Sequence, residues 1–195
     1  MEALRVAAYG SRYGRLGRNA WCVVWHISTS IALLASPHCA AADAALESDV
    51  KAAFLLNFTK FIEWPPAAFT EANSPFTICI VGSDPFGRVL DDLLAGESAG
   101  GRSLTVRRIA GVSEAQGCQI VYAGPDTKEL PKTLRSLGPG VLTVGEGDGF
   151  VRTGGIIGFV IDNRRVRFDI NQSAADSAGL KLSSKLLNVA RTVRK

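Results

Sequence analysis

Hydrophobic residues recur along the chain with two periods, which predict different secondary structures. Residues 49–63 carry apolar side chains at three- and four-residue spacing, a pattern that predicts a helix. Pro65 and Pro66 are expected to end it, because neither can donate a backbone hydrogen bond. Short apolar runs at residues 76–82 and 119–123 predict buried strands. Alternation of apolar and polar residues predicts a strand at 104–109, and a fourth strand is expected at 140–144.

Helices are expected between these strands, one with Pro85 in its first turn and another running to Leu137. Side chains able to accept a hydrogen bond from the first helical turn are predicted to cap the helices. They are Ser83 or Asp84, Asp126 or Thr127, Asn171, and Ser183 or Ser184. Gly179 is expected to stop the helix that follows Asn171, and the final helix is expected to run through Val193.

The pattern changes towards the C-terminus. Strands at 156–161 and 166–170 are separated by a short segment around Asn163 and Arg164. Asn tolerates the positive φ of a tight turn, so a β-hairpin is predicted. The chain is therefore expected to be an α/β protein: a single domain with a mostly parallel sheet flanked by helices, followed by a C-terminal β-hairpin and helix.

The first 42 residues have the organisation of a secretory signal peptide. Four arginines and one acid precede a short apolar stretch from Ala20 to Leu34, and small residues follow at 40–42. Cleavage is expected after Ala42 or Ala41, which leaves a domain over residues 43–195 and places it in the periplasm. The alternative is an uncleaved signal anchor.

Removal of this leader changes the charge of the protein. The whole chain has 195 residues, 47% of them hydrophobic, and a formal net charge of +4. Without the leader, 153 residues remain, with 18 basic and 17 acidic side chains. The basic character therefore belongs mostly to the leader, and the argument for nucleic-acid binding disappears with it.

The predicted mature domain also lacks histidine, because His26 and His38 lie in the leader. This excludes Ser-His-Asp and Cys-His catalytic sites and imidazole metal sites, so no enzyme activity, cofactor or metal is expected. Two cysteines remain, Cys79 and Cys118. In an oxidising compartment they favour one disulfide, and two separate buried thiols are the alternative.

Two glycine-containing loops follow predicted strands, where α/β proteins bind anions. The first contains Gly82, Asp84 and Gly87, but it lacks the spacing of a P-loop or a dinucleotide fold. It is either a ligand loop or an ordinary connection between a strand and a helix. The second covers 145–149 and carries acids that repel phosphate.

Arginines gather on the predicted hairpin at positions 164, 165 and 167. Arg165 and Arg167 project to one face of the strand, while Val166 and Phe168 project to the other. These arginines are either solvated surface charges or a basic patch for an acidic partner.

Several stretches resemble the YfiR-like family of periplasmic proteins. They lie at residues 50–65, 82–87, 154–159, 167–171 and 178–187, in the family's order, so the resemblance extends from Val50 to Ala190. It implies a periplasmic α/β domain that commonly dimerises. The Cys79 and Cys118 spacing is similar to that of a family disulfide. A second cysteine pair found in some members has no counterpart near residues 150–160.

The resemblance also implies a function. Well-understood members repress an inner-membrane diguanylate cyclase by binding its periplasmic domain, and an OmpA-like outer-membrane lipoprotein sequesters them. The leading hypothesis is therefore a non-enzymatic repressor that lowers cyclic-di-GMP signalling and biofilm formation. Its partner or dimer surface is expected on the apolar first helix and the hairpin, at Phe54, Phe58, Phe61, Trp64, Arg165 and Arg167.

The alternative hypothesis is a periplasmic small-ligand sensor acting with a sensor kinase or a TonB-dependent receptor. Its pocket would lie between the loops 82–87 and 145–149. A third hypothesis, an enzyme of unrecognised type, has no spacing signature to support it.

Overall fold

A computed structural model describes residues 38–71, 73–127 and 130–195. The chain divides into two compact units, Met1–Ala41 and Ala42–Lys195, and the fold described here is that of the second. Residues 1–37 of the predicted leader lie outside the described residues. Within the described part, no helix is both long and apolar enough to cross a bilayer.

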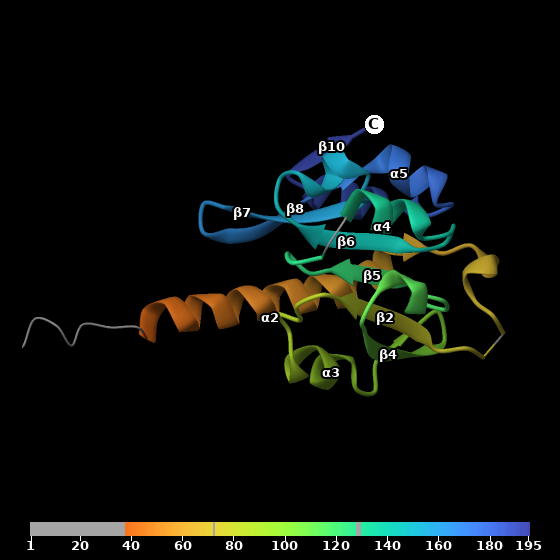
Figure 1. Cartoon of the computed structure of the whole chain (residues 1–195), viewed down its shortest axis with the longest axis horizontal. Helices are drawn as coiled ribbons and strands as arrows, with labels where there is room; N and C mark the ends of the chain where they lie inside the picture. The colour runs from red at the N-terminus through yellow and green to blue at the C-terminus, as the bar shows by residue number, and fades with distance from the viewer. Residues whose placement is uncertain (1–37, 72, 128–129) are drawn as a thin grey trace, which may run out of the picture. The chain divides into compact units, whose positions relative to one another are not determined.

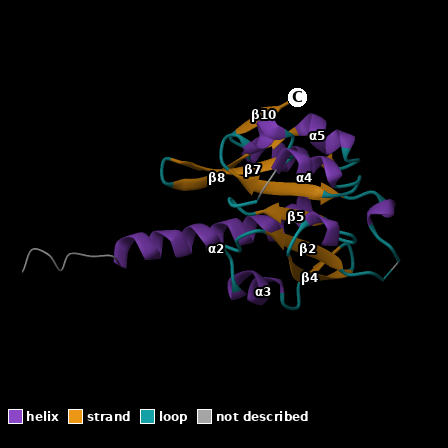
Figure 2. Ribbon diagram, viewed as in Figure 1, coloured by secondary structure: helices purple, strands orange, loops and turns teal. Residues whose placement is uncertain are grey.

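An eight-stranded sheet forms the centre of this unit (Figures 1 and 2). Its strand order is β10-β8-β7-β6-β5-β2-β4-β3. The five neighbours β4, β2, β5, β6 and β7 run parallel to one another. The strands are β2 Phe76–Val81, β3 Ser98–Ala99, β4 Arg102–Ile109, β5 Ile120–Ala123, β6 Leu142–Glu146, β7 Ile157–Asp162, β8 Arg165–Asn171 and β10 Thr192–Arg194. The predicted mixed α/β class with a mostly parallel sheet is confirmed.

Helices and short 3-10 turns connect and cover the strands (Figure 2). The α-helices are α2 His38–Phe61, α3 Arg88–Leu94, α4 Leu130–Ser136, α5 Gln172–Ser177 and α6 Ser184–Val189. The 3-10 helices are η1 Pro66–Ala68, η2 Val112–Glu114 and η3 Phe150–Thr153. A separate two-stranded ribbon joins β1 Ile62–Glu63 to β9 Lys181–Leu182 in antiparallel pairing.

The first predicted helix differs from the observed one at both ends. Helix α2 begins at His38 rather than at residue 49, and it ends at Phe61 rather than at residue 63. Ile62 and Glu63 leave the helix because they pair with Leu182 and Lys181. A long-range strand pairing, which helical periodicity does not reveal, therefore shortens the helix before the two prolines.

The predicted hairpin is confirmed in its turn and its register. Strands β7 and β8 pair antiparallel, with Asp162 opposite Arg165. Asn163 and Arg164 have φ values of 50° and 59°, as both central residues of a type I′ turn require. Because the last β6–β7 pair is Glu146 with Phe159, the hairpin extends past the end of β6 (Figure 1).

Two of the predicted caps are confirmed. The Asn171 side chain accepts a hydrogen bond from Ala174 N at the start of α5, and the Ser183 side chain accepts one from Leu186 N at the start of α6. Gly179 follows α5 with φ +74°, as predicted for a stop signal.

Other predicted helix boundaries are wrong. Helix α3 begins at Arg88 after Gly87, because Asp84 Oδ1 instead accepts hydrogen bonds from Phe86 N and Gly87 N in a preceding turn. Helix α6 ends at Val189 rather than at Val193. The last residues form β10 instead, since they find a strand partner in β8.

The strands bury one apolar cluster on each face of the sheet. Ile78 and Ile80 of β2 face the cluster that includes Leu55 and Phe58 of α2. Cys79 and Val81 alternate to the opposite face and join a smaller cluster. Helix α2 and the cysteine pair are consequently separated by the sheet.

Candidate functional site

Helix α2 packs on the sheet through an aromatic cluster. The Phe58 ring lies 6.0 Å from Phe159 and 5.4 Å from Phe168 between centroids, and Phe54 lies 5.2 Å from Phe168. Phe58 is 0% exposed. Its predicted place on a partner surface is therefore wrong, because this chain's own sheet covers it.

A shallow apolar groove runs beside this cluster, between α2 and α6. It encloses about 230 Å³. Phe54 and Phe61 line it from α2, and Leu186 and Val189 line it from α6. Phe61 is 37% exposed, and Val189 is also exposed. Among the four aromatic residues of the predicted surface, Phe61 is thus the one most available to a partner.

Trp64 has a structural position just after β1. Its indole Nε1 donates to the carbonyl of Gln119 at 3.2 Å, and its ring lies edge-on to Phe76 with centroids 4.8 Å apart. Gln119 in turn donates from Nε2 to the Ala68 carbonyl and accepts from Thr77 N. Trp64 is half-buried, and it ties the segment after α2 to the amino end of β5.

Arg165 and Arg167 are both exposed, as predicted. Phe168 lies against α2, so strand alternation puts the two arginines on the other face of β8. The structure therefore does not place them on the same face as the groove of Phe54 and Phe61.

The first glycine loop lies where the strand order reverses, between the carboxyl ends of β2 and β5. There Asp126 Oδ1 accepts hydrogen bonds from Ser83 N at 2.6 Å and Ser83 Oγ at 2.8 Å. These two hydrogen bonds hold the pKa of Asp126 below its ordinary value, and the bond from the Ser83 backbone has the larger effect. Asp126 thus joins the two loops; whether it caps the helix before Leu137, as predicted, depends on residues 128 and 129, which lie outside the described residues.

The same contact accounts for Gly82. A Cβ at this position would lie 2.6 Å from Asp126 Oδ1, and its φ is +80°. The chain's own carboxylate therefore occupies the place where an anion would meet the Ser83 backbone N–H.

Asp84 and Gly87 belong to a surface ion-pair network. Arg108 Nε donates to Asp84 Oδ2 at 2.9 Å, and its Nη2 donates to Asp91 Oδ2 and to the Gly87 carbonyl. The hydrogen bond from Arg108 lowers the pKa of Asp91, and its bonds to these acids raise the pKa of Arg108. The loop that contains Gly82, Asp84 and Gly87 is thus held by internal contacts.

The second glycine loop has a clear packing role. Gly145 and Gly155 lie against the two edges of the Phe150 ring, where no Cβ would fit. Gly147, with φ +86°, donates from its N–H to the Phe159 carbonyl at 2.8 Å. Gly145 and Gly155 thus leave room for the Phe150 ring of η3, and Gly147 joins this loop to β7.

A buried polar cluster that sequence reasoning missed joins this loop to α2. Lys51 Nζ lies 2.5 Å from Glu47 Oε1 and 2.9 Å from Glu146 Oε1. The Tyr122 hydroxyl donates to the same Glu146 oxygen. The pKa of Tyr122 is raised, mainly by burial and next by this hydrogen bond to Glu146. The sequence feature that could have revealed this cluster is Lys51 itself, because it is a charged residue four positions before Leu55 on the buried stripe of the helix.

A second missed pair fastens the C-terminal segment. Arg191 donates from Nε to Asp169 Oδ1 at 2.9 Å and from Nη2 to Asp169 Oδ2 at 2.6 Å. The same nitrogen reaches Asp148 Oδ1 at 2.6 Å. Asp169 is buried, and these bonds raise the pKa of Arg191. The arginine therefore connects the chain before β10 to β8 and to the second glycine loop.

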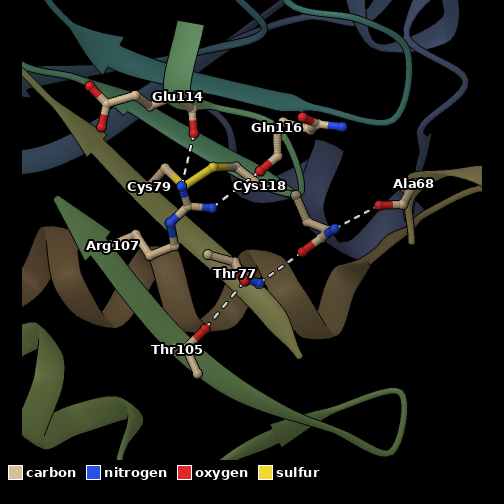
Figure 3. The surroundings of a disulfide bond; sticks show 9 residues. Ala68, Thr77, Cys79, Thr105, Arg107, Glu114, Gln116 and Cys118 are labelled. Carbon is tan, nitrogen blue, oxygen red and sulfur yellow. Dashed lines mark hydrogen bonds between the residues drawn. A yellow bond between two sulfur atoms is a disulfide. The ribbon is translucent and has the colours of Figure 1, made fainter. Parts of the chain in front are cut away.

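The predicted disulfide between Cys79 and Cys118 is present, with the two Cα atoms 5.8 Å apart (Figure 3). It joins β2 to the loop just before the neighbouring strand β5, on the face opposite α2. The Arg107 guanidinium lies beside it and donates to the carbonyls of Glu114 and Gln116 (Figure 3). Both sulfur-bearing residues are buried, so the bond is shielded from solvent thiols.

The described unit is thus a mixed α/β domain with an apolar groove between α2 and α6 and with ion pairs that hold its loops. In the residues that the structure describes, no group of three or more His, Cys, Asp or Glu side chains is arranged to hold a metal ion. The fold is that of a small mixed α/β domain with a mostly parallel sheet.

The chain belongs to the YfiR/HmsC-like family, whose model matches residues 48–191. This confirms the resemblance seen in the sequence. No curated protein matches the chain significantly.

Two solved structures are similar in part. One is a conserved domain protein from Vibrio cholerae O1 biovar El Tor, at 15% identity and a TM-score of 0.42, covering 60% of this chain and 54% of that one. The other is an ABC domain in complex with L-Trp from Streptococcus pneumonia, at 14% identity and a TM-score of 0.45, covering 71% and 58%. The chain spans little more than half the length of either structure.

Proposed function

We propose that this protein is a periplasmic regulator that binds the periplasmic domain of an inner-membrane diguanylate cyclase and represses it. Membership of the YfiR/HmsC-like family supports the class of partner. The observation that carries the proposal to particular residues is the apolar groove between α2 and α6, with Phe61 and Val189 exposed at its rim.

Repression needs only a difference in affinity for two states of the cyclase. A preference of about 100-fold for the inactive state corresponds to about 2.7 kcal/mol. Burial of one or two exposed apolar side chains supplies free energy of that size. Phe61 and Val189, with the accessible edge of Phe54, are therefore sufficient as the apolar centre of such a contact.

Other surfaces of the domain, and the leader, also have roles in the proposed function. Arg165 and Arg167 would contact a second surface, on the other face of β8 from the groove. A homodimer and an OmpA-like lipoprotein that sequesters the repressor are the further partners that we propose. The leader over residues 1–42 would deliver the protein to the periplasm.

Gene deletion and complementation test the cyclase assignment. Deletion should raise cyclic-di-GMP and biofilm, and the unchanged gene should restore both. Phe61→Glu should fail to restore them, whereas Val89→Glu should succeed, because Val89 is a similarly exposed apolar residue on α3 away from the groove. Unchanged cyclic-di-GMP after deletion would contradict the proposal.

Site-specific crosslinking identifies the partner directly. A photoreactive residue at position 61 should capture a membrane protein with a cyclase domain, and the same residue at position 89 should not. Capture of a sensor kinase or a TonB-dependent receptor at position 61 would favour the alternative function, a ligand sensor.

A further inference from the structure

A second groove lies at the opposite end of α2 from Phe61, between the helix and the projecting hairpin of β7 and β8. It encloses about 650 Å³, a volume in the range of small-molecule sites. Leu46 and Val50 line it from the helix, and Ile161 and Val166 line it from the hairpin. The two walls stay apart here because β6 has already ended at Glu146.

Its apolar walls are unusually open to solvent. Leu46 is 64% exposed and Ile161 is 52% exposed. They come from elements far apart in the sequence and face one space, so an apolar body placed between them would cover both.

The charged side chains at the rim of the groove determine which charge a bound ligand should carry. Arg164 and Arg165 line the groove, and in the described part of the chain neither forms an ion pair. Asp162, which is opposite Arg165 in the hairpin, instead accepts from Asn163 Nδ2 at 3.2 Å. Two guanidinium groups are therefore available to an anion.

The single acid of this groove is already engaged. Glu47 Oε1 lies 2.5 Å from the ammonium of Lys51, whose side chain is only 5% exposed. The groove thus presents apolar walls, two unpaired cations and a carboxylate that already has a cation of its own.

We propose that this groove binds a small amphiphile with an apolar chain and one carboxylate. The apolar chain lies between Leu46 and Ile161, and the carboxylate is held by Arg164 and Arg165 through charge-assisted hydrogen bonds. This site shares Arg165 with the second protein surface proposed above, but it uses neither Phe61 nor α6, on which the cyclase assignment rests.

Three ten-carbon probes separate the effect of charge from that of the apolar chain. Calorimetric titration of the purified protein below micellar concentrations should show binding of decanoate. Decan-1-ol should bind more weakly, and decyltrimethylammonium most weakly. Equal affinity for the three, or no binding of decanoate, would overturn the proposal.

Matched variants test the location. Arg164→Gln with Arg165→Gln should weaken decanoate binding by about tenfold or more, and Ile161→Asp should abolish it. Arg167→Gln, which removes one positive charge from β8, should leave it unchanged, because Arg167 does not line the groove. An equal loss in Arg167→Gln would show nonspecific attraction and overturn the site.

Light scattering separates a small ligand from a second copy of this chain. Ile161→Asp should have the same molecular mass in solution as the unchanged protein. Without ligand, the melting temperature of the variant should also be close to that of the unchanged protein. A change from dimer to monomer without any decanoate binding would assign the groove to a protein interface and overturn the proposal.

Discussion

The ammonium of Lys51 lies 2.9 Å from Glu146 Oε1 and joins helix α2 to the end of strand β6. The two residues are far apart in sequence, and Lys51 is buried although it is charged. Tyr122 donates to the same carboxylate, so three elements meet at one ion pair. This contact, together with the aromatic cluster of Phe54 and Phe58, fixes how α2 lies on the sheet.

Removal of this cation should destabilise the protein. Lys51→Met leaves Glu146 without its ion-pair partner in a site that is largely closed to water, at a cost of about 1–3 kcal/mol in free energy of unfolding. The control is Lys60→Met, which breaks an exposed pair with Glu97 at 3.1 Å and should cost less than about 1 kcal/mol. Urea denaturation measures both, and equal stability of the two variants would contradict the role of Lys51.

Two neighbouring phenylalanines on α2 should respond differently to truncation. Phe58→Ala empties a fully buried site between Phe159 and Phe168, and it should cost about 3–5 kcal/mol. Phe61→Ala removes a partly exposed ring and should cost about 1 kcal/mol or less. Denaturation of both variants checks the burial, and a larger loss for Phe61→Ala than for Phe58→Ala would refute it.

The disulfide should contribute measurably to stability. Cys79 and Cys118 are 39 positions apart, and in the chain-entropy model a loop of that length stabilises the fold by about 3–4 kcal/mol. Replacement of both cysteines by Ala should lower the free energy of unfolding by about that amount. Reductant should destabilise the unchanged protein and not the variant. An exported protein that titrates with two free thiols would contradict the bond.

Asp126 should make stability depend on pH at the junction of β2 and β5. Its pKa in the folded state is lowered from the ordinary value of 3.8, so its stabilising effect is full above that value. It is lost as the pH falls through the lowered pKa of the folded state. Asp126→Asn should therefore reduce the melting temperature at pH 7 and make less difference below pH 3.8. Asp92→Asn is the control, because Asp92 takes no part in this junction. A constant deficit for Asp126→Asn from neutral to acidic pH would oppose this interpretation.

Features that depend on neighbouring residues were predictable from the sequence. The hairpin turn follows from Asn163 and its flanking strands, and the Asn171 and Ser183 caps follow from side chains that reach a backbone N–H three positions away. The parallel sheet follows from alternating strands and helices. The cysteine pair was predicted with one alternative, because only two cysteines follow the leader.

Features that depend on distant surfaces were not predictable in the same way. The apolar stripe of α2 does not distinguish buried Phe58 from exposed Phe61. Their difference arises because Phe58 packs between rings of β7 and β8, whereas Phe61 lines the open groove beside α6. Likewise, Asp126 has the chemistry of a helix cap, and it meets Ser83 only because β2 and β5 are neighbours in the sheet.

Backbone preferences and short-range hydrogen bonds act within a few residues. The amino-acid sequence by itself therefore determines the turns, the caps and the class of fold. The exposure of a ring, the partner of a charge and the space between a helix and a hairpin depend on long-range packing. Lys51 with Glu146, and Arg191 with Asp169, are brought together only when the strands take their places in one sheet.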